Sequence, residues 1–186
     1  MAAVYFALLH YPVLDKDGRV INTAVTNLDL HDLARLARTY GLRGYYVAQP
    51  LALQRKLVER LLAYWRTEGA GEYNRTRQEA FEALRLVNDL DEAVAGIEAE
   101  TGSRPTIVGT SARRRPGAVS FPELRDRMAA GGCWLIVFGT GWGIEPGFMA
   151  ERADELLEPI DPGAGYNHLS VRAAAAIVID RLLGRP

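Results

Sequence analysis

A glycine-rich loop near residue 140 is the segment of this sequence best suited to bind a ligand. The stretch "CWLIVFGTGWGIEPGF" spans residues 133–148 and runs from apolar residues into Gly139, Gly141 and Gly143. Pro146 follows, where it suits the first turn of a helix. A strand that leads into a glycine loop and then a helix brings backbone N–H groups close to a ligand. The spacing is GxGxG, which differs from the GxGxxG of dinucleotide-binding loops.

Two further loops have a similar composition. One is "GTSAR" at residues 109–113, and the other is "IDPGAGYNHLS" at residues 160–170. Both lie at the ends of predicted strands. The carboxyl ends of parallel strands meet at one edge of a sheet, where ligands bind in α/β folds. We therefore expect the three loops to offer backbone donors and acceptors at a single site.

Four side chains in these loops each allow two interpretations. Trp142 suits stacking on a nucleobase, and it equally suits packing in the core or at a dimer interface. Asn167 suits N-capping of the last helix and also a place beside a ligand. His168 suits either orientation of a substrate or a structural hydrogen bond, and Tyr166 is equally ambiguous.

The run Arg113-Arg114-Arg115 is the densest positive segment of the chain. It directly follows the first loop, so it suits contact with phosphates, as RNA-binding residues would make. The alternative is a solvated turn before Pro116-Gly117. The net charge of −1 argues against a chain that coats nucleic acid by bulk charge, but it leaves a local basic patch open.

Length and composition indicate one domain over residues 1–186. Apolar residues make up 48% and charged residues 24%, which are ordinary globular values. Cys133 is the only cysteine, so we expect neither a disulfide nor a cysteine metal site. The N-terminal residues lack a signal-peptide pattern, and no apolar run approaches the ~20 residues that span a bilayer. We expect a cytoplasmic protein with no membrane partner and no metal.

Strand-like and helix-like segments alternate along the chain. This predicts a mostly parallel sheet of about six strands with helices on both faces. A turn is expected at residues 15–18 and a loop at residues 67–77. The predicted strands are 3–9, 44–50, 82–87, 105–110, 133–138 and 159–160, and the predicted helices are 29–41, 52–65, one ending at 100, 121–132, 146–158 and one ending at 183.

The order of these segments resembles that of the SPOUT class of methyltransferases, whose cofactor is S-adenosylmethionine. The resemblance rests on "IVGTSAR", "LIVFGTGWGI" and "YNHLSVRAAAAIVIDRLL", and it covers residues 105–184 well. The N-terminal stretch "HYPVLDKDGRVINTAVTNLDLHDLARLARTYG" extends it over nearly the whole chain, toward a bacterial family of S-adenosylmethionine-dependent RNA methyltransferases within that class.

This resemblance implies a C-terminal deep trefoil knot, a homodimer, S-adenosylmethionine as cofactor, and a base nitrogen or ribose 2′-hydroxyl of tRNA or rRNA as substrate. Apolar side chains would contact the adenine, and loop amides would bind it. The implied cofactor-binding residues are Thr110, Ser111, Gly139, Thr140, Gly141, Gly143, Ile144, Ile160, Gly163, Tyr166, Asn167, His168 and Leu169. Because close backbone approach favours glycine, we expect Gly141→Val to abolish cofactor binding.

Arg35, Arg113 and Asn167 are the candidate catalytic residues. In 2′-O-methylating members of the class, an arginine six residues before a glycine assists deprotonation, and Arg35 has this spacing to Gly41. The class places an asparagine six residues before that arginine, whereas this chain has Asp29. A free arginine is a poor base because of its high pKa, so an electrostatic role is the alternative.

Two other functions remain open at this point. A Rossmann-like oxidoreductase would use the glycine loop for a dinucleotide, with Asp161 placed to bind the ribose. The glycine spacing and the late position of the loop argue against it. A non-catalytic RNA-binding or dimerisation protein on a methyltransferase scaffold is the second alternative. Stabilisation by S-adenosylmethionine but not by NAD would separate the enzyme from both.

Overall fold

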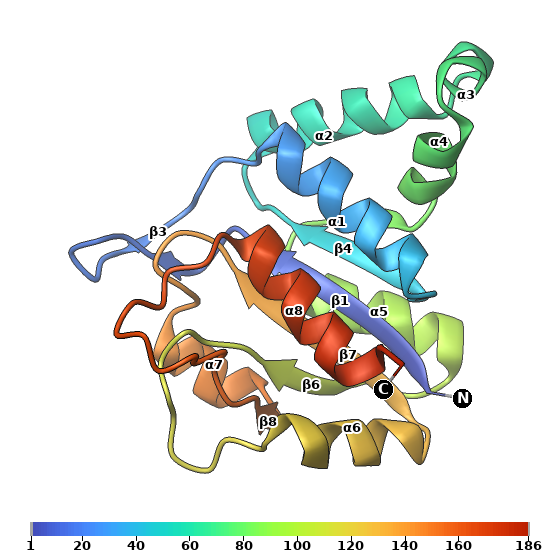
Figure 1. Cartoon of the computed structure of the whole chain (residues 1–186). Helices are drawn as coiled ribbons and strands as arrows, with labels where there is room; N and C mark the ends of the chain where they lie inside the picture. Colours follow the sequence, from blue (N-terminus) through green and yellow to red (C-terminus); the bar gives the residue numbers. More distant parts are fainter. Residues whose placement is uncertain (1, 186) are drawn as a thin grey trace.

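A six-stranded parallel sheet organises the fold of this computed structural model, which describes residues 2–185 (Figure 1). Its strand order is β5-β4-β1-β7-β6-β8, and every neighbouring pair is parallel. The strands are β1 (Ala3–Leu9), β4 (Gly44–Ala48), β5 (Leu84–Val87), β6 (Thr106–Gly109), β7 (Cys133–Gly139) and β8 (Glu155–Leu156). The expected parallel sheet is therefore confirmed.

The position of β7 distinguishes this sheet from a doubly wound nucleotide-binding fold. In such a fold the fourth parallel strand lies beside the first. Here β1 pairs with β7, the fifth parallel strand in chain order, and β6 lies outside it. The register places Leu9, at the end of β1, opposite Gly139. This topology does not fit the Rossmann-like alternative.

Helices cover both faces of the sheet. The side chains of Phe6 and Leu8 belong to one buried cluster with α1, α2, α6 and α8, while those of Tyr5 and Ala7 belong to the other with α5 and α7. This alternation follows from the period of two along a strand. The helices are α1 (Asn27–Thr39), α2 (Ala52–Trp65), α3 (Glu68–Tyr73), α4 (Arg75–Phe81), α5 (Leu90–Thr101), α6 (Phe121–Ala129), α7 (Pro146–Arg152) and α8 (Val171–Leu183). None of the helices in residues 2–185 is long and apolar enough to cross a membrane.

The predicted loop at 67–77 is wrong, because the structure places α3 and α4 there. Each short helix begins at a capping side chain: Thr67 accepts a hydrogen bond from the amide of Ala70, and Asn74 accepts one from Arg77. Such caps satisfy amides that have no partner inside a helix. The glycines of "TEGAGEY" had concealed the first of these helices.

The predicted helix at 146–158 is too long, and the last strand is misplaced. α7 ends at Arg152, because the chain turns to place β8 beside β6. The carboxylate of Asp154 fixes this turn: it accepts a hydrogen bond from the amide of Ile107 at 2.8 Å and pairs with Arg104 at 2.9 Å. Residues 159–160, predicted as a strand, follow β8 without strand structure.

A small hairpin extends from the expected turn at 15–18. It consists of β2 (Val13–Leu14) and β3 (Val20–Ile21) and projects beyond the carboxyl ends of the central strands (Figure 1). The Asp15 carboxylate stabilises its turn by accepting hydrogen bonds from two backbone amides, each at 2.8 Å. The hairpin thus lies at the same edge of the sheet as the three predicted loops.

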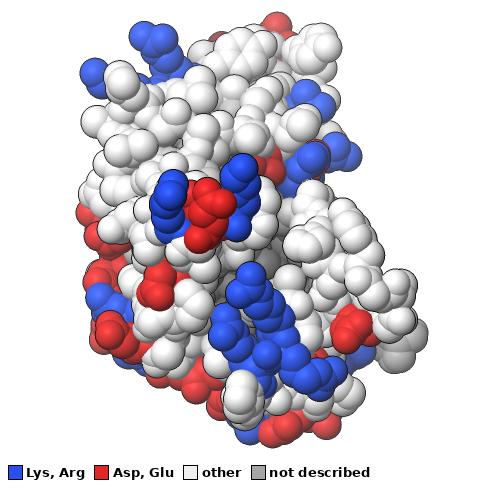
Figure 2. All heavy atoms as spheres, turned by 90° about the vertical axis from the view of Figure 1, so that its left-hand side faces the viewer, with Lys and Arg blue, Asp and Glu red and all other residues white. Residues whose placement is uncertain are grey.

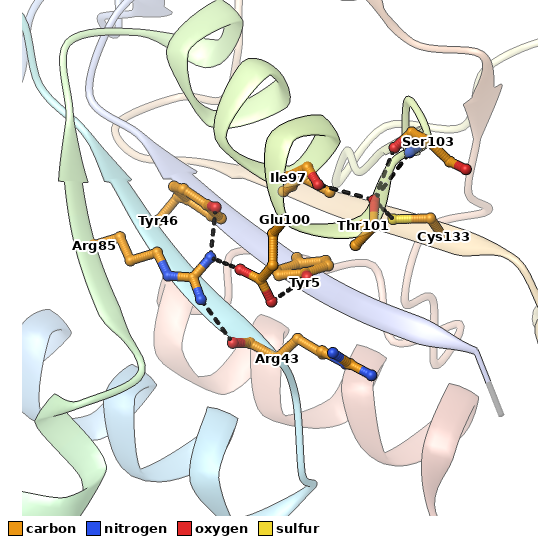
Figure 3. A network of polar contacts seen from close by, with 9 residues as sticks. All are labelled: Tyr5, Arg43, Tyr46, Arg85, Ile97, Glu100, Thr101, Ser103 and Cys133. Atoms are coloured by element: carbon orange, nitrogen blue, oxygen red, sulfur yellow. Dashed lines mark hydrogen bonds and ion pairs between the residues drawn. The ribbon is translucent and has the colours of Figure 1, made fainter.

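A polar network lies between α5 and the sheet, at the end of the sheet away from the three loops (Figure 3). The guanidinium of Arg85 donates to the hydroxyl of Tyr46 at 2.8 Å and pairs with Glu100 at 2.6 Å. Glu100 also accepts a hydrogen bond from the Tyr5 hydroxyl at 2.8 Å. Burial and this hydrogen bond both raise the pKa of Tyr5. The network joins β1, β4, β5 and α5 at the end of the sheet farthest from the loops.

Candidate active site

The three predicted loops surround one cleft of about 1160 Å³ at the carboxyl ends of the strands. The residues that line it include Thr110, Ser111, Gly139, Thr140, Gly141, Gly143, Ile144, Ile160, Asn167, His168 and Leu169. Of the predicted cofactor residues, Gly163 and Tyr166 do not line it. Figure 2 looks onto this edge of the molecule and shows basic side chains gathered on it. Three loops from between residues 109 and 170 thus meet at one place.

The middle loop is hydrogen-bonded to the N-terminal hairpin. The amide of Trp142 donates to the carbonyl of Leu14, and the amide of Leu14 donates to the carbonyl of Gly143, both at 2.9 Å. The amide of Glu145 donates to the carbonyl of Pro12 at 3.1 Å. These contacts occupy amides that the sequence suggested for a ligand. Within the described chain, the loop amides of Gly141 and Ile144 donate no hydrogen bond to protein.

Gly141 is needed for this contact between loop and hairpin. Its φ of 59° lies in the left-handed region, and a Cβ atom built there would lie 2.8 Å from the carbonyl oxygen of Leu14. That is closer than real Cβ contacts. The close backbone approach expected at Gly141 therefore exists, but it involves the protein's own hairpin. We therefore expect Gly141→Val to abolish cofactor binding by disrupting the packing of the loop against the hairpin.

Thr140 contacts a chain of polar side chains that runs from the cleft to a buried histidine. Its hydroxyl donates to the carbonyl of Leu9 at 3.2 Å and also contacts the hydroxyl of Thr23. The Thr23 hydroxyl lies 3.0 Å from Nδ1 of His10. His10 is fully buried, and burial lowers its pKa to about 4. Neither His10 nor Thr23 stood out in the sequence, because each is an isolated polar residue.

The first loop places two arginines on the wall of the cleft. The hydroxyl of Thr110 donates to the carbonyl of Val137 at 2.8 Å, which fixes the loop on β7. Arg113 and Arg115 line the cleft, whereas Arg114 does not. Arg113 and Arg114 are exposed, and none of the three forms an ion pair within residues 2–185. Their charges are therefore available to a bound polyanion.

The third loop contacts the first through Asn167. The side-chain amide of Asn167 donates to the carbonyl of Ala112 at 3.0 Å. Asn167 does not cap the last helix, as the sequence had suggested: Ser170 caps α8 by accepting from the amide of Ala173. The ring of His168 packs edge-on against Tyr166, with centroids 5.3 Å apart, and both side chains are exposed.

Trp142 is exposed at the mouth of the cleft. Its side chain is 55% exposed, so it does not pack in the core of this chain. An exposed indole at a cleft that also carries free arginines suits base stacking, and it also suits burial by a second chain. The core alternative for Trp142 is excluded.

The two polar positions singled out on α1 lie in different environments. Asp29 is buried, lines the cleft and pairs with Arg172 of α8 at 3.4 Å. Arg35 is exposed and lies outside the cleft of its own chain. The structure therefore brings Arg113 and Asn167 together in the cleft, but it does not bring Arg35 to them.

The cleft suits S-adenosylmethionine in two respects. The amides of Gly141 and Ile144 can donate hydrogen bonds to a ligand, because no acceptor within residues 2–185 occupies them. Apolar side chains from four segments stand around them: Phe138, Ile144, Leu157, Ile160 and Leu169. Main-chain donors beside apolar walls fit an adenine ring.

The sequence profile of the SAM-dependent RNA methyltransferase family matches residues 3–184. This chain belongs to the SAM-dependent RNA methyltransferase family. S-Adenosylmethionine is accordingly its cofactor, as the sequence implied. The oxidoreductase alternative is therefore set aside.

Some relatives of this chain are longer proteins. The chain is 48% identical over 183 residues to an uncharacterised protein of Aquifex aeolicus, covering 98% of this chain and 89% of that one. It is 45% and 44% identical to proteins named tRNA (guanine-N(1)-)-methyltransferase from Oleidesulfovibrio alaskensis and Nitratidesulfovibrio vulgaris. The match covers 97% of this chain but 42% of each of those proteins, so more than half of their length lies outside it.

Solved structures with the same fold are SPOUT methyltransferases. TrmJ from Z. mobilis ZM4 superposes with a TM-score of 0.61 at 16% identity, covering 100% of this chain and 70% of that one. The A. aeolicus TrmH/SpoU tRNA modifying enzyme gives 0.57 at 15% identity, with coverage of 98% and 75%. An AdoMet-bound rRNA methyltransferase from Sinorhizobium meliloti gives 0.56 at 14%, with coverage of 96% and 55%. At these identities the likeness establishes the fold.

Proposed function

We propose that the cleft binds S-adenosylmethionine and that the chain, acting as a single domain, transfers the methyl group to a base nitrogen or ribose 2′-hydroxyl of tRNA or rRNA. The observation that carries this proposal is the convergence of the three loops on one cleft beside free arginines. The names of the two tRNA (guanine-N(1)-)-methyltransferase relatives favour tRNA. More than half of each of these relatives lies outside the match, so their names do not decide which atom this chain methylates.

The residues of the chain divide into three roles in this proposal. The bound cofactor supplies an activated methyl group on a sulfonium. The amides of Gly141 and Ile144 and the apolar walls orient the adenine, and the Asn167 contact holds the third loop over it. Arg113 and Arg115 position RNA phosphates at the rim, with Arg114 beside them. Methyl transfer then depends mainly on alignment, which preorganised loops provide.

We also propose the finer features that the family resemblance implies: a trefoil knot, a homodimer and a cytoplasmic location. The hydrogen bond from Asn167 to Ala112 supports the knot, since it brings the segment before α8 against the loop after β6. Two exposed side chains support the dimer. A partner chain would cover Trp142, and dimerisation could bring Arg35 to the cleft of the partner. Sedimentation equilibrium tests the dimer, and a monomer at micromolar concentration would contradict it.

The test of the function is the thermal midpoint with S-adenosylmethionine, S-adenosylhomocysteine and NAD. A ligand that binds only the native state raises stability by about 2.7 kcal/mol at a hundredfold excess over its Kd. We expect the two sulfur ligands to raise the midpoint by several degrees and NAD to leave it unchanged. Absence of a shift with all three, confirmed by calorimetry, would overturn the proposed cofactor site. Cofactor binding without transfer to any RNA would favour the non-catalytic alternative.

A further inference from the structure

We infer that Asp29 accepts the proton that the RNA nucleophile loses during methyl transfer; this inference rests on the proposed function. Asp29 is the one acidic side chain that is buried among residues 2–185. It is 7% exposed, and it lines the same cleft as the three loops. A buried carboxylate on the wall of a cleft is costly unless it is paired, so its partners decide what it can do.

Two partners hold the Asp29 carboxylate in place. Its Oδ2 accepts a hydrogen bond from the hydroxyl of Thr26 at 2.6 Å, and its Oδ1 lies 3.4 Å from Nε of Arg172. Arg172 is in turn held by Asp32, whose Oδ2 lies 2.7 Å from Nη1. The stronger contact of Arg172 is therefore with Asp32. The Oδ1 atom of Asp29 keeps a long contact with the arginine and has lone pairs free for another donor.

The other proton acceptors of the cleft are less suited to this role. The ionisable cleft residues with lone pairs are Asp29, Glu158 and His168. The Oε1 of Glu158 accepts a hydrogen bond from the amide of Phe121 at 2.8 Å, which fixes the start of α6. His168 lies on an exposed loop, and the structure gives its ring no polar partner within residues 2–185. A general base must be held within hydrogen-bonding reach of its proton. Asp29 is held at both of its carboxylate oxygens, and it is the buried one of the three.

The proton balance of the reaction requires such an acceptor. The lone pair of the nucleophilic oxygen or nitrogen forms the new bond to the methyl carbon. The carbon–sulfur bond breaks, and its electron pair stays on sulfur, which loses its positive charge. The proton of the nucleophile passes to Oδ1 of Asp29 and from there to water. The guanidinium of Arg172, whose Nε lies 3.4 Å from Oδ1, fixes the position of the accepting carboxylate.

The experiment compares Asp29→Asn with Asp32→Asn in the full-length protein. Both variants remove one carboxylate next to Arg172, but only the first changes the wall of the cleft. Single-turnover transfer of tritiated methyl groups is measured on total tRNA and rRNA from cells that lack the encoding gene. Loss of a general base is expected to lower the rate of Asp29→Asn about 100-fold, with Asp32→Asn nearer wild type. Calorimetry with S-adenosylhomocysteine and filter binding of tRNA should give dissociation constants within about threefold of wild type for both.

A pH profile separates a base from a merely structural carboxylate. Hydroxide can replace a missing base, so the rate of Asp29→Asn should rise about tenfold per unit between pH 7 and 9, while the wild-type rate changes little. An unchanged rate in Asp29→Asn, or a loss that cofactor or RNA affinity explains in full, would overturn the role of Asp29. A wild-type protein that binds S-adenosylhomocysteine but methylates no RNA would instead overturn the proposed function, and the role of Asp29 with it.

Discussion

At the residue scale, polar side chains behind the glycine loop hold it to the first strand of the sheet. His10, Thr23 and Thr140 form a continuous contact chain that ends at the carbonyl of Leu9. His10 sits at the end of the central strand with its Nε2 atom buried and without a partner in the described chain. Burial strongly favours the neutral ring, which makes this histidine a structural element that depends on pH.

The stability of the protein should therefore fall in mildly acid solution. The pKa of His10 is lowered from 6.5 to about 4 on folding, so the unfolded chain binds this proton more readily between these values. Linkage then makes the free energy of unfolding rise with pH through this window and fall as pH drops, by up to about 3 kcal/mol. Urea unfolding at pH 4.5, 5.5 and 7 measures this. His10→Asn should show a flatter dependence, and equal slopes in the two proteins would contradict the assignment.

Two glycine positions in the middle loop should respond differently to alanine. Both have positive φ, but a Cβ at Gly141 would meet the Leu14 carbonyl at 2.8 Å, whereas one at Gly143 would meet nothing within 4 Å. The backbone strain of about 1 kcal/mol is common to both, so the steric clash is the difference. We expect Gly141→Ala to lower the thermal midpoint and the affinity for S-adenosylhomocysteine more than Gly143→Ala. Equal effects would show that the hairpin contact is unimportant.

At the element scale, the sequence predicts long apolar or amphipathic segments well and very short ones poorly. The strand at 3–9 and the helix at 52–65 are confirmed residue for residue, because the first is an unbroken apolar run and the second has the apolar spacing of a helix. β8 was misplaced because two residues cannot show a period, and its position is set by Asp154 and the β6 edge. The hairpin contact at Leu14 joins segments 128 residues apart, and no local pattern encodes it.

The contact between the first and third loops should contribute mainly to ligand binding. The side-chain amide of Asn167 joins the two loops by donating a hydrogen bond to the carbonyl of Ala112. The rest of the third loop is largely exposed. Asn167→Asp keeps the shape but removes the donor, so it should weaken S-adenosylhomocysteine binding several-fold, consistent with the loss of about 1 kcal/mol. The thermal midpoint without ligand should change little. Calorimetry and a melting curve measure the two quantities, and a large drop in the midpoint with normal affinity would reverse this reading.

At the scale of the whole molecule, charge is distributed unevenly rather than in excess. The net charge is −1, yet unpaired arginines lie at the edge of the sheet that carries the cleft. Such a molecule can bind a polyanion at one face while the rest of its surface does not attract it. The sequence showed the arginine run, but only the fold shows that Arg113 and Arg115 face the cleft while Arg114 does not.

Replacement of Arg113, Arg114 and Arg115 by alanine should weaken tRNA binding and reduce its dependence on salt. Each lost phosphate contact lowers the slope of log affinity against log salt by about 1. S-Adenosylhomocysteine binding should stay within about threefold of wild type, since this charge serves the polyanion. Arg75→Ala, an exposed arginine on α4 outside the cleft, is the matched control. Filter binding between 50 and 300 mM salt measures the slope, and an unchanged slope would exclude these residues from the RNA contact.

The pairing of β1 with β7 also determines when the site can exist during synthesis. The Thr140 hydroxyl bonds to the carbonyl of Leu9 across 131 residues, and the glycine loop is complete only when the hairpin at 13–21 has docked on it. A chain still emerging from the ribosome can pair β1 with β4 and β4 with β5, but it leaves the other edge of β1 open until β7 appears. Such long-range pairing is slow, and until it forms the unpaired strand edge is prone to aggregation. Nascent chains that end before residue 145 should therefore bind no cofactor and should depend on chaperones.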